Sequence, residues 1–156
     1  MRSWQVLTLS LLAAAGCGSG TESSERPEKP ARPAQLEIVA GDFSFDLEPV
    51  IVATGDVETT LINKGEQIHQ AAFYRLNDGV EYDEFERSIL EDDSLIPQLA
   101  EGGRAGVVRV VSPGDTYVRP SDELPAGSYS VICFIKDPET GKNHFELGMI
   151  ARFEVR

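Results

Sequence analysis

The sequence predicts an all-β fold, either a sandwich or a barrel, and three observations indicate it. Short runs of alternating apolar and polar residues recur from residue 35 to the C-terminus, with the period of half-buried strands. Turn-forming pairs such as Gly41-Asp42 and Gly55-Asp56 separate these runs. Only one stretch, 82–91, has apolar residues at helical spacing. Short strands in this arrangement are typical of sandwiches and barrels rather than of βαβ units.

The predicted strands follow one another closely along the chain. The run at 42–46 continues the alternation of the first strand and places Phe43 and Phe45 on one face. The run at 57–62 is rich in β-branched residues, which favour strands. Strands are expected at 35–40, 42–46, 50–53, 57–62, 70–76, 106–111, 116–119, 128–135 and 148–155.

One short amphipathic helix is expected at 82–91, lying on the β structure, and Gly102-Gly103 is expected to close this insertion. Phe85 and Ile89 recur at helical spacing within an acidic background. Such dense carboxylates usually form a solvated face, and a docking surface is the alternative. They do not have the ligand spacing of a calcium loop.

The N-terminus predicts export. Residues 1–16 have the layout of a secretory signal, with an apolar segment too short to span a bilayer. The residues before Cys17 resemble the lipobox of bacterial lipoproteins, in which the cysteine becomes the acylated first residue. The alternative is an ordinary signal peptide that leaves Cys17 as a free thiol. Residues 17–34 are predicted to be a disordered linker because they lack large apolar side chains, and 35–156 form the folded domain.

Charge narrows the range of partners. The chain has 14 Lys and Arg against 26 Asp and Glu, a formal net charge of −12. Nucleic acid and anionic membrane surfaces are polyanions that such a protein repels. We therefore expect a protein partner with a basic face, unless the acidic charge serves solubility alone.

The chain carries few soft metal ligands, and they form one set. Apart from Met1 and Cys17, the ligands are His69, Cys133, His144 and Met149. Strand parity places Cys133 and Met149 on inward faces. Each residue alone has an ordinary structural explanation, as a hydrogen-bonded histidine or as a small or flexible core residue. Together they form the ligand set of a copper site that passes single electrons.

The spacing of these residues resembles that of the cupredoxins, the family of plastocyanin and azurin. The matching motifs are Asn-x-Gly-x-x-x-His at 63–69, Gly-x-Tyr-x-x-x-Cys at 127–133 and His-x4-Met at 144–149. The resemblance covers about 35–156 and implies a Greek-key β-sandwich with a type 1 copper site. It implies His69, Cys133 and His144 as equatorial ligands and Met149 as the long axial ligand. The ten residues between Cys133 and His144 exceed the loops of plastocyanin and azurin, and we expect a polar turn there that shields the site or contacts a partner.

The resulting functional hypothesis is a monomeric one-electron carrier outside the bacterial cytoplasm, tethered to a membrane through Cys17 and serving a redox protein. Copper sequestration or delivery is the main alternative, although Met-rich and His-rich tracts are missing from the sequence. A metal-free protein that serves as an interaction module is the other alternative. We do not expect an enzyme, because two histidines are too few for a multicopper site, and a nucleophilic cysteine must be exposed.

Overall fold

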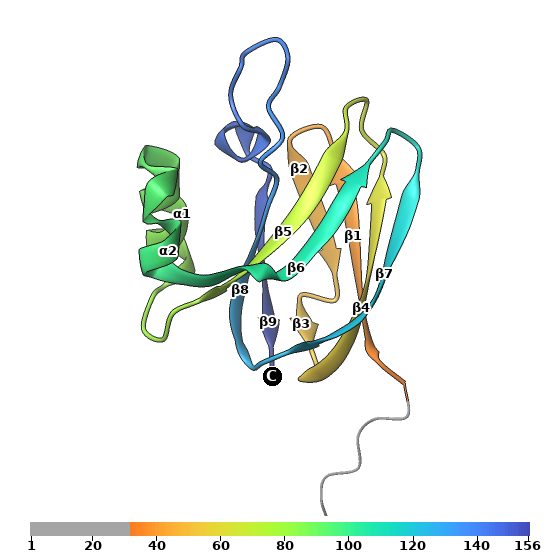
Figure 1. Cartoon of the computed structure of the whole chain (residues 1–156), viewed down its shortest axis with the longest axis vertical. Coiled ribbons are helices and arrows are strands. Elements are labelled where there is room, and N and C mark those ends of the chain that lie inside the picture. Colours follow the sequence, from red (N-terminus) through yellow and green to blue (C-terminus); the bar gives the residue numbers. More distant parts are fainter. Residues whose placement is uncertain (1–31) are drawn as a thin grey trace, which may run out of the picture.

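Two β-sheets packed face to face make up the body of the protein (Figure 1). The computed structural model describes residues 32–156, with the backbone alone for 102–108. The predicted leader at 1–16, Cys17 and nearly all of the linker at 17–34 lie outside the described residues. The strands are β1 (Ala34–Gly41), β2 (Ser44–Glu48), β3 (Ile51–Val52), β4 (Gly55–Asn63), β5 (His69–Leu76), β6 (Ala100–Val111), β7 (Thr116–Leu124), β8 (Gly127–Ile132) and β9 (Ile150–Val155).

The strand order confirms the predicted β-sandwich. One sheet has the order β2-β1-β4-β7 and the other β3-β9-β8-β5-β6. Most neighbours are antiparallel, whereas β1 with β4 and β3 with β9 are parallel. Several neighbouring strands are far apart in sequence, such as β5 and β8, so that the chain repeatedly crosses between the sheets. These crossings bring residues 69 and 133 to the same end of the sandwich.

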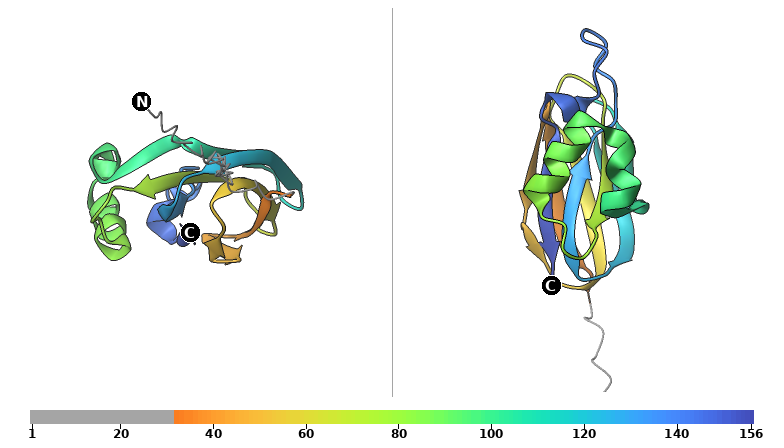
Figure 2. Two further views of the ribbon diagram at one scale, coloured as in Figure 1. Left: turned by 90° about the horizontal axis from the view of Figure 1, so that it is seen from below. Right: turned by 90° about the vertical axis from the view of Figure 1, so that its left-hand side faces the viewer.

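The core lies between the two sheets, and strand β8 separates it from a second apolar cluster. Successive side chains of a strand point to opposite faces. Tyr129, Val131 and Cys133 therefore belong to the core between the sheets, while Ile132 packs outward beneath the helices with Phe145. Figure 2 (right) looks onto these helices, which lie in front of the strands.

The helical insertion is longer than predicted. Helix α1 (Tyr82–Glu91) has the expected bounds, but the 3-10 turn η1 (Asp93–Leu95) and helix α2 (Ile96–Leu99) follow it. The prediction of one helix was wrong because segments this short contain too few turns to produce a periodic signal. The prediction that Gly102-Gly103 closes the insertion was also wrong, since Gly102 pairs with Tyr74 inside β6. Pairing with a neighbouring strand outweighs the weak strand propensity of glycine.

Three other boundaries differ where the chain approaches the candidate site. Phe43 lies in the turn before β2 with φ 61°, rather than in a strand. Strand β8 ends at Ile132 rather than at 135, and β9 begins at Ile150 rather than at 148. Between them, His144–Leu147 forms the 3-10 turn η2. Gly148, with φ 112°, ends this turn in the left-handed region that glycine adopts without strain.

Candidate metal centre

The four predicted ligands lie at one end of the sandwich, at the termini of strands. His69 is the first residue of β5, Cys133 follows the last residue of β8, His144 begins η2, and Met149 precedes β9. All four side chains are 0% exposed. The loop that joins Cys133 to η2 projects beyond this end of the sheets in Figure 1.

Three of the predicted ligands place their donor atoms around one point. The Nδ1 atoms of His69 and His144 are 3.2 Å apart, and Cys133 Sγ is 3.6 Å from His144 Nδ1. The three donor atoms lie within 4.8 Å of one another. Met149 is buried in the same core cluster as Cys133. The structure therefore brings together residues from positions 69, 133 and 144.

Backbone hydrogen bonds join Cys133, His144 and Met149 into one frame. Cys133 N donates to Met149 O at 3.2 Å, and Met149 N donates to His144 O at 2.9 Å. Phe145 N in turn donates to Cys133 O at 3.0 Å. These bonds connect the end of β8 to η2 directly. The side chains of the three residues therefore project from a segment whose backbone is held by its own neighbours.

Gln67 contacts the outer nitrogen of His144 and thereby determines where its proton lies. Asp137 Oδ1 accepts a hydrogen bond from Gln67 Nε2 at 2.9 Å. Because a carboxylate accepts but does not donate, this bond orients the amide and turns Gln67 Oε1 toward His144 Nε2, 3.1 Å away. An amide oxygen accepts, so this contact is a hydrogen bond when Nε2 carries the proton, which leaves Nδ1 as a lone pair facing Cys133 Sγ.

Asp42 plays a looser part at His69. Its Oδ1 lies 3.5 Å from His69 Nε2, and this nitrogen makes no hydrogen bond to any described residue. Without a hydrogen bond from Nε2, Asp42 leaves the His69 proton free to lie on Nδ1. The 3.2 Å contact between the two Nδ1 atoms is a hydrogen bond when His69 carries its proton on Nδ1, and a bound metal would displace that proton.

The loop 64–68 is held at several points. The side-chain amide of Asn63 donates to Gln67 O at 2.7 Å and Val111 O at 2.9 Å, and its oxygen accepts from Gly65 N. Asp42 Oδ1 accepts from Glu66 N at 2.8 Å. A Cβ on Gly65 would lie 2.7 Å from His69 Nε2 and closer still to Asp42 Oδ1, so a larger side chain would force one of these two side chains to move. This explains the glycine of the motif at 63–69.

Burial disfavours the charged forms of all three donor residues. Burial lowers the pKa of His69, and the neighbouring His144 lowers it further, while Asp42 opposes both effects. Burial likewise lowers the pKa of His144. It raises the pKa of the Cys133 thiol, against backbone hydrogen bonds from Gln70 and Ile135 that favour the thiolate. A bound cation would reverse this preference for the thiol, because it stabilises the thiolate directly.

The spacing of the donor atoms fits a single metal ion. Bonds of about 2.0 Å to nitrogen and 2.3 Å to sulfur, meeting near 120°, separate two nitrogens by roughly 3.5 Å and nitrogen from sulfur by roughly 3.7 Å. The observed separations are 3.2 and 3.6 Å. Two lone pairs this close repel unless a proton or a cation lies between them. The donor set therefore fits a soft or borderline metal such as copper.

Several residues at this site were not predicted from the sequence. Phe43 packs the edge of its ring against His144, with centroids 5.2 Å apart, and it helps to cover the imidazole. Asp42, Gln67 and Asp137 orient the imidazoles by hydrogen bonds or close contact. The sequence shows only that Asp42 adjoins Phe43 and that Gln67 lies two residues before His69. Nothing in the sequence signals Asp137, which lies in the predicted polar turn 134–143.

The comparison with solved structures agrees with this architecture. Auracyanin from the photosynthetic bacterium Roseiflexus castenholzii superposes with a TM-score of 0.54 at 17% sequence identity, over 78% of this chain and 96% of that one. The chain has the cupredoxin fold.

Other cupredoxins superpose less closely. Auracyanin A of Chloroflexus aurantiacus, described as a blue copper protein, reaches a TM-score of 0.49 at 18% identity, over 80% of this chain and 100% of that one. Azurin from Methylomonas sp. strain J reaches 0.48 at 12% identity, over 80% and 98%. No family model and no curated protein matches the sequence. Within residues 32–156, no helix has both the length and the apolar character needed to cross a membrane.

Proposed function

We propose that the protein is a type 1 copper protein that carries single electrons. His69, Cys133 and His144 would hold the copper ion, and Met149 would add a weaker thioether ligand. One observation carries the proposal: three buried donor atoms meet at the spacing of a single ion, with the His144 lone pair directed inward by Gln67. The cupredoxin fold supports it.

The protein's part in electron transfer is to keep the ligands still. Copper would supply a couple between Cu(I) and Cu(II), which prefer different ligands and geometries. The backbone bonds among residues 133, 144 and 149 oppose movement of those ligands. The buried apolar surroundings exclude water, and backbone hydrogen bonds to Cys133 adjust the electron density on sulfur. A site that changes little between redox states exchanges electrons without large rearrangement.

We infer a carrier rather than an enzyme. The four side chains are buried, and His144 is covered by Gln67 and Phe43. A substrate therefore has no direct approach to the donor atoms. Electrons cross such a cover between proteins, whereas an oxidase or reductase needs an open coordination position.

The surface beside the site supports a partner with a basic face. A hollow of about 230 Å³ lies between the end of α1 and η2, and acidic residues from both elements line it, including Glu91, Asp92 and Glu146. Phe145, which follows the candidate ligand His144, also lines it. A cationic redox protein bound in this hollow would approach the residue that follows the candidate ligand His144.

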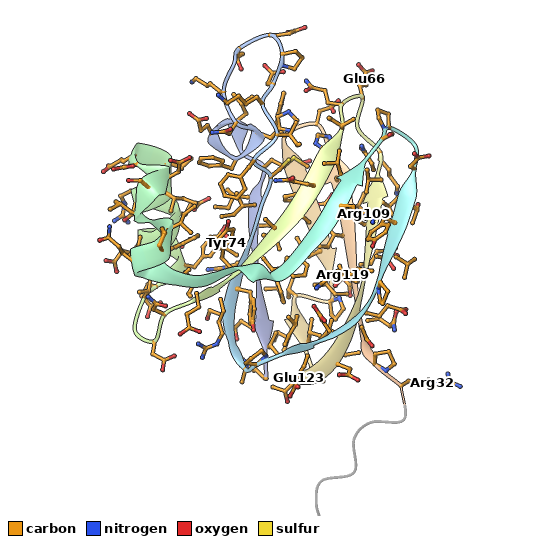
Figure 3. All side chains as sticks on the ribbon, viewed as in Figure 1. Arg32, Glu66, Tyr74, Arg109, Arg119 and Glu123 are labelled. Carbon is orange, nitrogen blue, oxygen red and sulfur yellow. The ribbon has the colours of Figure 1, made fainter. Side chains whose placement is uncertain are left out.

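We also propose an extracytoplasmic location, with the domain anchored through a lipid on Cys17. Arg32 marks the point where the described chain begins, at the end of the sandwich opposite Glu66, as Figure 3 shows. A lipid anchor on Cys17 would therefore hold the domain by the end remote from the candidate site. This arrangement leaves the site free to meet a soluble partner. Labelled palmitate incorporated by the full chain, and lost in Cys17→Ser, would test the anchor.

The decisive experiment is titration of the domain 35–156 with Cu(II), followed by absorption spectroscopy, voltammetry and metal analysis. We expect one copper per chain, an intense visible thiolate band and a reversible potential. Cys133→Ser should lose the band. Met149→Leu is the matched control, because it removes only the axial ligand and should keep the band while its potential moves.

The same experiment separates the alternatives. Tight Cu(I) binding without a visible Cu(II) band would indicate sequestration or delivery instead. Colourless zinc in place of copper, or no metal at all, would contradict the electron carrier and favour an interaction module.

A further inference from the structure

The tautomer of His144 depends on a chain of hydrogen bonds that starts outside the ligand set. Asp137 lies in the loop 134–143 and is only 3% exposed. Its Oδ2 accepts from the backbone N of Thr140 at 2.8 Å and from the Thr140 hydroxyl at 2.7 Å. Its Oδ1 accepts from Gln67 Nε2. Both carboxylate oxygens are therefore engaged, each with a different partner.

Gln67 is held at four points, which leaves its amide one arrangement. Its backbone N–H points at Asp42 Oδ1, 3.4 Å away, and its carbonyl accepts from Asn63. Its side chain donates to Asp137 and accepts from His144. The Gln67 amide nitrogen therefore faces the Asp137 carboxylate, which can only accept, and the amide oxygen faces Nε2 of His144.

We propose that Asp137 and Gln67 are positioning residues that hold His144 with its proton on Nε2 before any metal binds. Nδ1 is thereby kept as an inward lone pair, ready to coordinate. This inference rests on the proposed function only in naming Nδ1 as the ligand atom. The tautomer itself is a property of the metal-free protein.

The substitution Asp137→Asn tests this chain because it should reverse each bond in turn. The N–H of Thr140 needs an acceptor, so the new amide keeps its oxygen toward Thr140 and turns its NH₂ toward Gln67. Gln67 then rotates to accept with Oε1 and presents its own NH₂ to His144. Nε2 of His144 becomes an acceptor, and the proton moves to Nδ1. The isosteric substitution Asp137→Asn would therefore place a proton on Nδ1 of His144, the nitrogen whose lone pair is needed to bind a metal.

The experiment is ¹⁵N NMR of the imidazoles in the metal-free, ¹⁵N-labelled domain near neutral pH, where long-range ¹H–¹⁵N couplings distinguish the tautomers. We expect Nε2–H for His144 in the wild type and Nδ1–H in Asp137→Asn. Copper affinity should fall roughly ten- to a hundredfold in that variant, the usual effect of losing an outer contact to a ligand. Glu139→Gln removes the same charge from an exposed position in the same loop. It should change neither the tautomer of His144 nor the copper affinity.

A wild-type His144 protonated on Nδ1 would overturn the proposal, and this measurement needs no variant to fold. A folded Asp137→Asn whose His144 keeps Nε2–H would overturn it as well. Both of these tests measure the tautomer in the metal-free protein and do not involve copper. If the domain fails to bind copper but shows the expected tautomers, the proposed function fails while the positioning role stands.

Discussion

At the scale of single residues, buried polar groups define the candidate site as much as its ligands do. Asn63 is 1% exposed and uses both ends of its amide. It donates to the carbonyls of Gln67 and Val111 and accepts from Gly65 N. The residue therefore ties the loop before His69 to the end of β6. The motif at 63–69 contains Asn63 for this reason, and not as a ligand.

Asn63→Ala should destabilise the protein by about 2 kcal/mol. The substitution leaves two carbonyls and one N–H without their partner, and an unsatisfied buried group costs about 1–3 kcal/mol. Denaturant unfolding measures the change. Asn77→Ala is the control, since Asn77 makes one side-chain bond near the surface, to Gln98 O, and should cost less than about 0.5 kcal/mol. Equal losses in the two variants would show that the Asn63 bonds contribute nothing special.

At the scale of elements, helix α1 is an apolar cover for the outer face of the second sheet. Phe85 and Ile89 point into the cluster formed with Leu76, Ile132 and Phe145. Phe145 follows His144, so the helix packs against the residue that adjoins a candidate ligand. The carboxylates of the same helix point mostly to solvent.

Ile89→Ala should lower the free energy of unfolding by about 3 kcal/mol, because it removes a side chain that is 1% exposed and leaves a cavity. The adjacent Leu90 is 47% exposed, and Leu90→Ala should change stability by less than about 0.5 kcal/mol. Urea titration of both variants makes the comparison within one helix. A small loss in Ile89→Ala would mean that α1 does not contribute to the folded core.

The loop 134–143 has its own pH dependence through Asp137. Hydrogen bonds from Thr140, and then from Gln67, lower the pKa of Asp137 to about 2. An unfolded aspartate has a pKa of about 3.9, so the folded protein favours the ionised form. The stabilising contribution is complete above about pH 5 and is lost as pH falls through about 4 toward about 2.

The stability difference between wild type and Asp137→Asn should therefore be constant above about pH 5 and should shrink between about pH 4 and 2. Denaturant titrations across this range measure it. A difference that stayed constant through the acid range would show that the Asp137 carboxylate has an ordinary pKa.

At the scale of the whole molecule, the two ends of the sandwich carry different features. The candidate metal centre, η2 and the long loop lie at one end, and the described chain enters at the other (Figure 1). The two sheets hold this arrangement, since β5 pairs with β8 and thereby sets His69 beside Cys133. A metal at one end would thus link segments that are more than sixty residues apart.

On the proposed function, copper should stabilise the whole domain, because only the folded chain brings the candidate ligands together. At a concentration about 100 times its dissociation constant, it should add about 2.7 kcal/mol and raise the Tm by about 10 °C. Scanning calorimetry with and without Cu(II) measures the shift, and a chelator should abolish it. An equal shift in Cys133→Ser would mean that copper binds elsewhere.

The sequence alone was sufficient for an all-β fold, for the bounds of α1 and for the inward orientation of Cys133, while the choice of a sandwich over a barrel rested on the cupredoxin resemblance. These features follow from periodicity, which each segment carries without reference to the rest of the chain. The four candidate ligands were also named from their chemistry and spacing.

Tertiary structure decided what surrounds those ligands. Gln67 and Asp137 are seventy residues apart, and Phe43 reaches His144 from a turn that the alternation had assigned to a strand. Polar side chains such as these have many potential partners, and only the packing of the two sheets selects one. Strand ends near the site were misplaced for the same reason, because pairing with a neighbour, and not local propensity, determines where a strand stops.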